Sequence, residues 1–158
     1  MKHTIGVLME NKPGVLSRIS TLLARRNFNI ESITAGPTRD HNVTRMTVVV
    51  EGDEYVAENA AAEIAKLEDV TGIERMSAAD SMSREIILIK VSASDHQRSG
   101  LIDLAKAVGA TVVDVTKSTL MLEFSDTPEK INVLIELLSG YDVLDMARGG
   151  AIALKTGE

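Results

Sequence analysis

The sequence lacks cysteine and tryptophan, and aromatic residues make up only 3% of its 158 positions. Without cysteine, the chain can form no disulfide, thiolate metal site or cysteine nucleophile. A core must be aliphatic, and hydrophobic residues are plentiful at 44%. The scarcity of aromatics also argues against RNA binding on a small α/β sheet, because that mode of binding stacks bases on aromatic side chains.

Long apolar runs and basic clusters are missing as well. No apolar run approaches the roughly 18 residues of a membrane-spanning helix. The net charge is −6, and a division after residue 80 gives −3 for each part, with 9 basic and 12 acidic residues before it and 8 and 11 after it. Neither part offers a basic surface to nucleic acid or to an anionic membrane. The N-terminus enters a strand without a signal-peptide layout, so we expect a cytoplasmic protein.

The motifs of common catalytic sites are also absent. The three histidines, His3, His41 and His96, are far apart, without the close pairing of a transition-metal site. The sequence contains no G-x-S-x-G, no phosphate-binding G-x-x-x-x-G-K-[ST] and no G-x-G-x-x-G. We therefore expect neither catalytic residues nor metal ligands on this chain.

Hydrophobic periodicity predicts a βαββαβ unit in the first half of the chain. Alternating apolar residues indicate strands, and an i, i+4, i+7 spacing indicates helices. The predicted elements are a strand at 2–10, a helix at 14–27, strands at 28–37 and 44–51, a helix at 53–67 and a strand at 70–76.

The same order then repeats, which predicts an α+β fold of two tandem ferredoxin-like domains, 1–78 and 84–158, joined by a linker at 78–83. The second unit comprises a strand at 85–93, a helix at 97–108, strands at 111–116 and 119–124, a helix at 128–138, and strand material at 143–148 and 151–155. Two domains of this size are each marginal alone, so each would gain from pairing with a partner.

The ferredoxin-like strand order 4-1-3-2 leaves the 28–37 strand at a sheet edge. An exposed edge needs covering. Pairing with the same edge of a second chain would give an eight-stranded sheet with two-fold symmetry. We therefore expect a homodimer.

The segment Glu10-Asn11-Lys12-Pro13-Gly14-Val15-Leu16-Ser17-Arg18 joins the first strand to the first helix. A helix start presents free N–H groups, and a glycine there allows close approach of a carboxylate. Pro13 suits the first helical turn. A simpler interpretation is that Asn11 caps the helix. Val15, Leu16 and Ile30 fit either a core or an aliphatic pocket, and Asn29 could be only the first residue of a strand.

Three further stretches make a family resemblance specific: Phe28-Asn29-Ile30-Glu31-Ser32-Ile33-Thr34, Arg45-Met46-Thr47-Val48 and Ala147-Arg148-Gly149-Gly150-Ala151-Ile152-Ala153-Leu154. Together with the turn, the sequence resembles the small regulatory subunits of acetolactate synthase (acetohydroxyacid synthase) over nearly its whole length. The resemblance implies an amino-acid-binding ACT domain at 1–78 and the family's C-terminal domain at 84–158. It also implies that the residues that bind valine are Asn11, Gly14, Val15, Leu16, Asn29 and Ile30.

The same resemblance implies a chain with no catalytic site of its own. It would bind the large catalytic subunit, raise its activity and confer feedback inhibition by valine or a related branched-chain amino acid. Thiamine diphosphate, magnesium and FAD would lie on the partner. Two alternatives remain open from the residues: an ACT-type sensor for another biosynthetic enzyme, and a small acylphosphatase-like enzyme.

Overall fold

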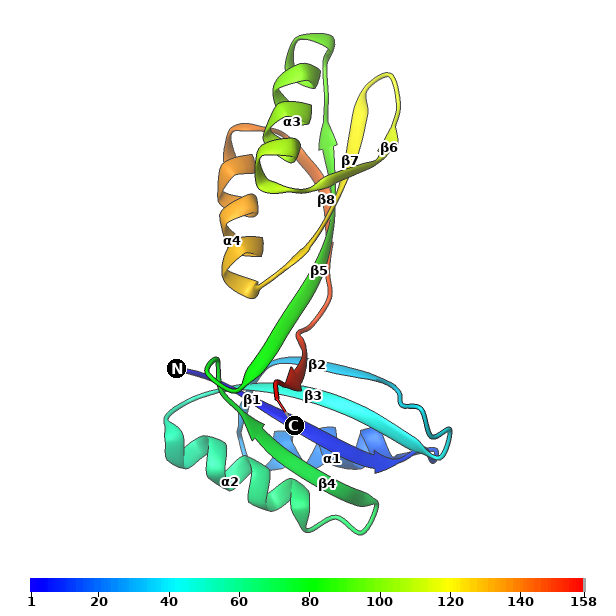
Figure 1. The fold of residues 1–158 in the computed structure, drawn as a ribbon, viewed down its shortest axis with the longest axis vertical. Helices are drawn as coiled ribbons and strands as arrows, with labels where there is room; N and C mark the ends of the chain where they lie inside the picture. The colour runs from blue at the N-terminus through cyan, green and yellow to red at the C-terminus, as the bar shows by residue number, and fades with distance from the viewer. Residues whose placement is uncertain (158) are drawn as a thin grey trace. The chain divides into compact units, whose positions relative to one another are not determined.

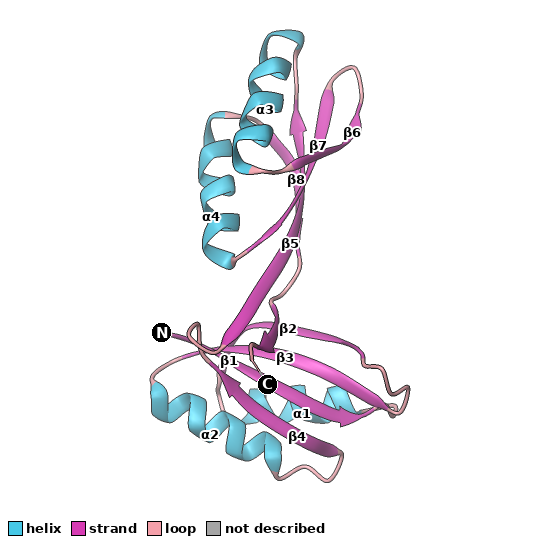
Figure 2. Cartoon of the chain, in the orientation of Figure 1, coloured by secondary structure: helices cyan, strands magenta, loops and turns pink. Residues whose placement is uncertain are grey.

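A computed structural model describes residues 1–157. The chain forms two compact units, one made of Met1–Ser83 together with the residues from Ala151 onward, and the other of Arg84–Gly150. Each unit carries helices on one face of an antiparallel sheet (Figure 2).

The first unit has the predicted βαββαβ order (Figure 1). Its elements are β1 (Lys2–Glu10), α1 (Val15–Arg25), β2 (Asn29–Pro37), β3 (Val43–Glu51), α2 (Glu54–Ala65) and β4 (Val70–Met76). The strand order is β2-β3-β1-β4, so β2 is an edge, as the sequence predicted.

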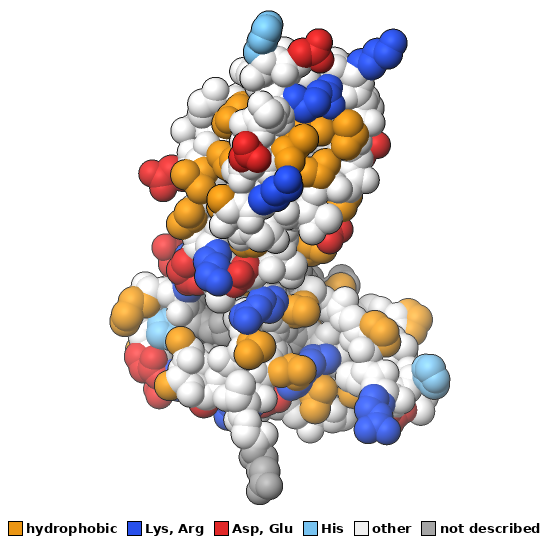
Figure 3. Space-filling view, turned by 45° about the horizontal axis from the view of Figure 1, so that its top comes forward, with side chains coloured by type: hydrophobic (Ala, Val, Ile, Leu, Met, Phe, Trp, Pro, Cys, Tyr) orange, Lys and Arg blue, Asp and Glu red, His pale blue; other side chains and the backbone are white. Residues whose placement is uncertain are grey.

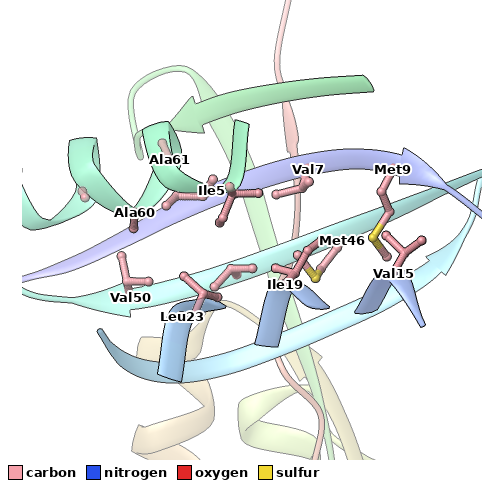
Figure 4. Close-up of a cluster of buried hydrophobic side chains, with 13 residues drawn as sticks. Ile5, Val7, Met9, Val15, Ile19, Leu23, Met46, Val50, Ala60 and Ala61 are labelled. Carbon is pink, nitrogen blue, oxygen red and sulfur yellow. The ribbon is translucent and has the colours of Figure 1, made fainter. Parts of the chain in front are cut away.

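An aliphatic core lies between this sheet and its two helices. Alternate residues of β1 and β3 face the helices, and one stripe of α1 faces the sheet. Figure 4 shows these side chains interdigitating, with Val15 beside Met9. The fully buried members include Ile5, Val7, Ile19, Leu23, Met46, Val48, Val50, Ala57, Ala60 and Ile64.

The second unit repeats the arrangement. Its elements are β5 (Ser81–Ser92), α3 (Asp95–Val108), β6 (Thr111–Val115), β7 (Thr119–Asp126), α4 (Pro128–Leu137), the short 3₁₀ helix η1 (Leu138–Gly140) and β8 (Val143–Arg148). The order β6-β7-β5-β8 matches that of the first sheet. Gly109 ends α3 at a φ of 82°, as the sequence predicted. The fold class is therefore confirmed.

The segment between the repeats is shorter than predicted. The linker was expected at 78–83, but β5 already begins at Ser81. Only a turn separates the repeats. It is closed by two hydrogen bonds, in which the Asp80 carboxylate accepts from the N–H and the hydroxyl of Ser77 at 2.6 and 2.7 Å.

The last strand, β9 (Ile152–Lys155), is grouped with the first unit although it follows the second repeat in the chain. It pairs with β5 and lies against β1, β3 and β4 (Figure 1, dark red). The sequence placed it in the domain 84–158, whereas by contact it belongs with the first unit. The physical reason is burial: Ala151 and Ala153 are only 2% and 4% exposed. The domain boundaries of 1–78 and 84–158 otherwise remain a prediction.

Candidate functional site

The connection between β1 and α1 is a tight turn over residues 12–15. Val15 N–H donates to the Lys12 carbonyl at 3.4 Å, and Gly14 has φ 87° and ψ −11°. These angles are those of the third residue of a type II turn, a position that needs glycine. Helix α1 begins at Val15, after Pro13, so the expectation that Pro13 lies in the first helical turn is wrong.

Two neighbouring loops hold this turn in place. Asn11 N–H donates to the Asn42 carbonyl at 2.8 Å, and its side-chain amide donates to the His41 carbonyl at 3.0 Å. From the other side, Glu10 N–H donates to the Asp69 carbonyl at 2.8 Å. The side chain of Asn11 therefore braces a loop and does not cap α1, which excludes the simpler interpretation of this residue.

The start of α1 has no side chain of its own that could neutralise its N–H groups. No side chain caps the helix and no acidic residue lies in its first turn. Apart from Val15 N–H, which donates to the Lys12 carbonyl, the first N–H groups of α1 have no side-chain cap, and the helix dipole favours a negative charge beside them. Lys12 is nearby, but it forms an ion pair with Glu10. The hydrogen bond from Lys12 to Glu10 and the charge of Glu10 raise the Lys12 pKa above its ordinary value.

The two apolar residues after Gly14 differ in their surroundings. Val15 is 2% exposed and belongs to the core, whereas Leu16 is 43% exposed. The helical stripe explains the difference, because Val15 shares its face with Ile19 and Leu23. Of these two, only the Leu16 side chain is free to contact a ligand beside the turn.

The remaining two candidates lie on β2. Asn29 is exposed, and its amide donates to a carboxylate oxygen of Glu51 at 2.8 Å. Ile30 is half-buried and packs against the core. In the sheet register, Asn29 pairs with Glu51, and Glu51 pairs with Lys2. Asn29 is thus level with Lys2 of β1, with β3 between them, at the end of the sheet opposite Asn11.

The sequence predicts a turn at His41-Asn42 but not that the loop 38–42 supports the candidate turn through Asn11. The conformation of this loop is fixed by Asp40, whose carboxylate accepts from the backbone N–H of Asn42 at 2.9 Å, and by Thr38, whose hydroxyl donates to the Val43 carbonyl at 2.9 Å. The Thr-x-Asp-x-Asn spacing is typical of such side-chain-stabilised turns and could have indicated it.

Residues 1–157 contain no group of three or more histidine, aspartate or glutamate side chains placed to hold a metal ion. Of the histidines, His3 lies 3.6 Å from Glu54. Nor does this part of the chain include a helix long and apolar enough to cross a membrane. Charged side chains of both signs are interspersed on the face shown in Figure 3, with no basic patch there.

The βαββαβ unit with an uncapped glycine turn at its first helix defines the class of the protein, an ACT-domain protein. The family model described as "AHAS small subunit-like ACT domain" matches residues 5–72. A second model, "Small subunit of acetolactate synthase", matches residues 84–157.

Whole-chain relatives identify the family. A probable acetolactate synthase small subunit of Archaeoglobus fulgidus is 39% identical, covering 99% of this chain and 98% of its own. The acetolactate synthase small subunit of Mycolicibacterium smegmatis is 38% identical, covering 98% and 91%. The crystal structure of the Thermotoga maritima small subunit superposes with a TM-score of 0.93 at 29% identity, covering 100% and 99%. The chain belongs to the family of acetolactate synthase small subunits.

Family membership confirms the resemblance and the class predicted from the sequence. The relatives are named small subunits, which agrees with a chain that serves the enzyme without a catalytic site of its own. Membership of this family also places the chain in branched-chain amino acid biosynthesis and implies a catalytic large subunit as its partner. The assignment of Asn11, Gly14, Val15, Leu16, Asn29 and Ile30 as ligand-binding residues stays a prediction.

Proposed function

We propose that this chain activates the catalytic large subunit of acetolactate synthase and confers feedback inhibition by valine or a related branched-chain amino acid. The observation that carries the proposal is the turn at Gly14. It presents the uncapped start of α1, is braced from two sides, and has an exposed aliphatic side chain, Leu16, next to it. An amino-acid carboxylate would accept from the N–H groups, and a branched side chain would pack against Leu16.

The second half of the proposed site comes from another copy of the chain. Within one chain, Asn11 and Asn29 lie at opposite ends of a sheet whose central strand spans Lys2 to Glu10. At about 3.3 Å per residue, this length separates them by roughly 26 Å. Antiparallel pairing of the two β2 edges would bring Asn29 of one chain to the end of the sheet where the other chain has its turn.

The β2 edge suits such a homodimer. It carries a bulge at Glu31, between Ile30 and Ser32, and Lys2 forms an ion pair with Glu31. Beyond the bulge, residues 32–37 run in regular register with β3 and present an unpaired edge. Regular edge strands pair readily with an identical edge.

Regulation would follow from linkage. Valine bound at the paired edges would favour one of two states of the complex with the catalytic subunit, and its differential affinity for these states would set the inhibition. A coupling of roughly 1–3 kcal/mol is typical of such effects. The thiamine diphosphate, magnesium and FAD of the reaction would be held by the catalytic subunit, and the complex would work in the cytoplasm.

Calorimetry of the small subunit with a panel of amino acids tests ligand binding, and an acetolactate assay with and without the small subunit tests activation. We expect valine or a close relative to bind, the small subunit alone to be inactive, and the mixture to turn over faster than the catalytic subunit alone. Full activity of the small subunit alone, or a small subunit that neither binds an amino acid nor stimulates its partner, would refute the proposal.

A further inference from the structure

The chain passes between its two units twice, once after Ser83 and again after Gly150. The strands on either side of these passages are paired with each other, because β5 pairs first with β9 and then with β8. The returning segment, from Arg148 to Thr156, is fastened at each of its ends.

In the first unit, the end of this segment is held by Asp80. Thr156 N–H donates to the Asp80 carbonyl at 2.8 Å, and Lys155 Nζ lies 3.9 Å from the Asp80 carboxylate. The same carboxylate accepts from the backbone and hydroxyl of Ser77. The C-terminal strand is thereby tied to the turn that closes the first repeat.

Between its ends, β9 covers the face of the first sheet that the helices leave open. Thr47 and Val49 point to this face, since their neighbours in β3 point to the helices, yet they are only 3% and 8% exposed. On β9, Ala153 is 4% exposed, while its neighbour Leu154 is 59% exposed and faces outward. A small side chain on the inner face lets the two backbones approach closely.

In the second unit, the segment is held by an ion pair between Arg148, which is partly exposed, and Glu85, which is buried. Nε and Nη2 of Arg148 reach the same Glu85 carboxylate oxygen at 2.7 and 2.6 Å, and Glu85 is 8% exposed. Nη1 of Arg148 donates to Asn132 on α4 at 2.7 Å. Gly149 N–H donates to the Ile86 carbonyl at 2.8 Å. Arg148 thus joins β8 to both β5 and α4.

Only two residues, Gly149 and Gly150, separate Arg148 from Ala151. A chain spans at most about 3.3–3.6 Å per residue, so this connection has little slack. We infer that β9 is the relay by which the state of the first sheet reaches the second unit, an inference that rests on the proposed regulation by valine. Strand β9 lies against β1, and β1 ends at Glu10, just before the turn over residues 12–15 where the ligand is proposed to bind.

Two variants of neighbouring residues on β9 test this relay in the complex of the small subunit with its catalytic partner. Ala153→Glu places a charged side chain where 4% of the residue is exposed and should lift the strand from the sheet. Leu154→Glu introduces the same charged side chain at the exposed neighbour and should leave β9 in contact with the sheet. Hydrogen exchange of the peptide covering residues 150–157 reports whether β9 is displaced.

A second pair of variants changes the hydrogen bond between Thr156 and Asp80. It keeps the test valid if Ala153→Glu misfolds. Thr156→Pro removes the N–H that donates to Asp80, whereas Thr156→Ala keeps it. We expect Ala153→Glu and Thr156→Pro to show faster exchange, to bind valine with near wild-type affinity and to stimulate the partner. The effect of valine on catalysis, typically a factor of about 5 to 150, should fall toward one in both. Leu154→Glu and Thr156→Ala should behave as wild type.

The inference is overturned if either displaced variant remains fully inhibited by valine, if Ala153→Glu exchanges no faster than wild type, or if Leu154→Glu loses inhibition equally. Loss of valine binding in both displaced variants would also overturn it, because β9 would then shape the site rather than relay its state. A wild-type complex that does not respond to any amino acid would refute the proposed function itself, and the relay with it.

Discussion

Asn11 and Asn29 lie at opposite ends of the same antiparallel sheet: Asn11 follows the last residue of β1, and Asn29 is aligned through Glu51 with its first residue, Lys2. Neither residue can reach the other within one chain. A ligand that contacts both must bind between two chains, and this relationship makes the proposed site testable by single substitutions and by mixing chains.

Gly14→Asp is expected to abolish valine binding, since it places a negative charge where the ligand carboxylate would sit. A Cβ at Gly14 meets no atom within 4 Å, so the substitution fits, but the φ of 87° adds roughly 1–2 kcal/mol of backbone strain. Gly14→Asn is the matched control, because asparagine has the same shape, tolerates positive φ equally and carries no charge. Calorimetry should show much weaker binding for the aspartate than for the asparagine variant. Equal affinities would mean that no anion binds at this helix start.

Asn29→Ala is expected to lower valine affinity by a factor corresponding to roughly 1–3 kcal/mol, the cost of losing buried polar contacts. The variant should fold normally, because Asn29 is exposed and its bond to Glu51 lies at the surface. Glu51→Ala removes the partner of that bond and keeps Asn29, so it should bind valine as wild type does. If Glu51→Ala weakens binding as much as Asn29→Ala, the effect arises from the sheet edge and not from a ligand contact.

The Asp80 turn should weaken in acid. The hydrogen bonds from the Ser77 hydroxyl and N–H hold the pKa of Asp80 below its ordinary value. A carboxyl group with a lowered folded-state pKa stabilises the fold fully above the unfolded value of about 3.9, and this contribution is lost as pH falls through the folded-state pKa. The melting temperature of the wild type should be higher than that of Asp80→Asn at pH 6, and this difference should shrink below about pH 4. A difference independent of pH would show that the charge of Asp80 does not stabilise the turn.

A chain truncated after Asp80 should keep the turn at Gly14 and the β2 edge, and therefore dimerise and bind valine. It should confer weak or no valine inhibition, because the second unit is missing. It should also melt at a lower temperature than the full chain, since removal of β9 exposes Val49 and Thr47. Full valine inhibition by the truncated chain would show that the second unit carries no signal.

Much of the fold follows from local patterns in the sequence. The β4 and β8 strands were predicted with the bounds that the structure has, because alternation and flanking turn residues define them locally. The position of β9 could not be predicted in this way. Alternation indicates a strand at 151–155, but the choice of sheet depends on contacts with β1 and β3 more than 100 residues earlier.

The candidate site was predicted less completely than the fold. The Pro-Gly pair correctly indicated a turn, but only the structure shows that Gly14 precedes the helix with a positive φ and that Asn11 braces a loop. Val15 was assigned to the ligand on family resemblance, whereas helical periodicity already aligned it with Ile19, and the structure buries both. Which chain supplies Asn29 to a given site depends on how two chains assemble. Local patterns in the sequence do not show that assembly.

The central claim, a valine site shared between two chains, is tested most directly with mixed dimers. Chains carrying Gly14→Asp and chains carrying Asn29→Ala, each with a different affinity tag, are co-expressed, and the heterodimer is purified and titrated with valine by calorimetry. If each site takes its turn from one chain and Asn29 from the other, the heterodimer has one doubly defective and one intact site. It should therefore bind one valine per dimer with wild-type affinity, although either homodimer binds weakly. A heterodimer in which both sites stay weak would contradict the account.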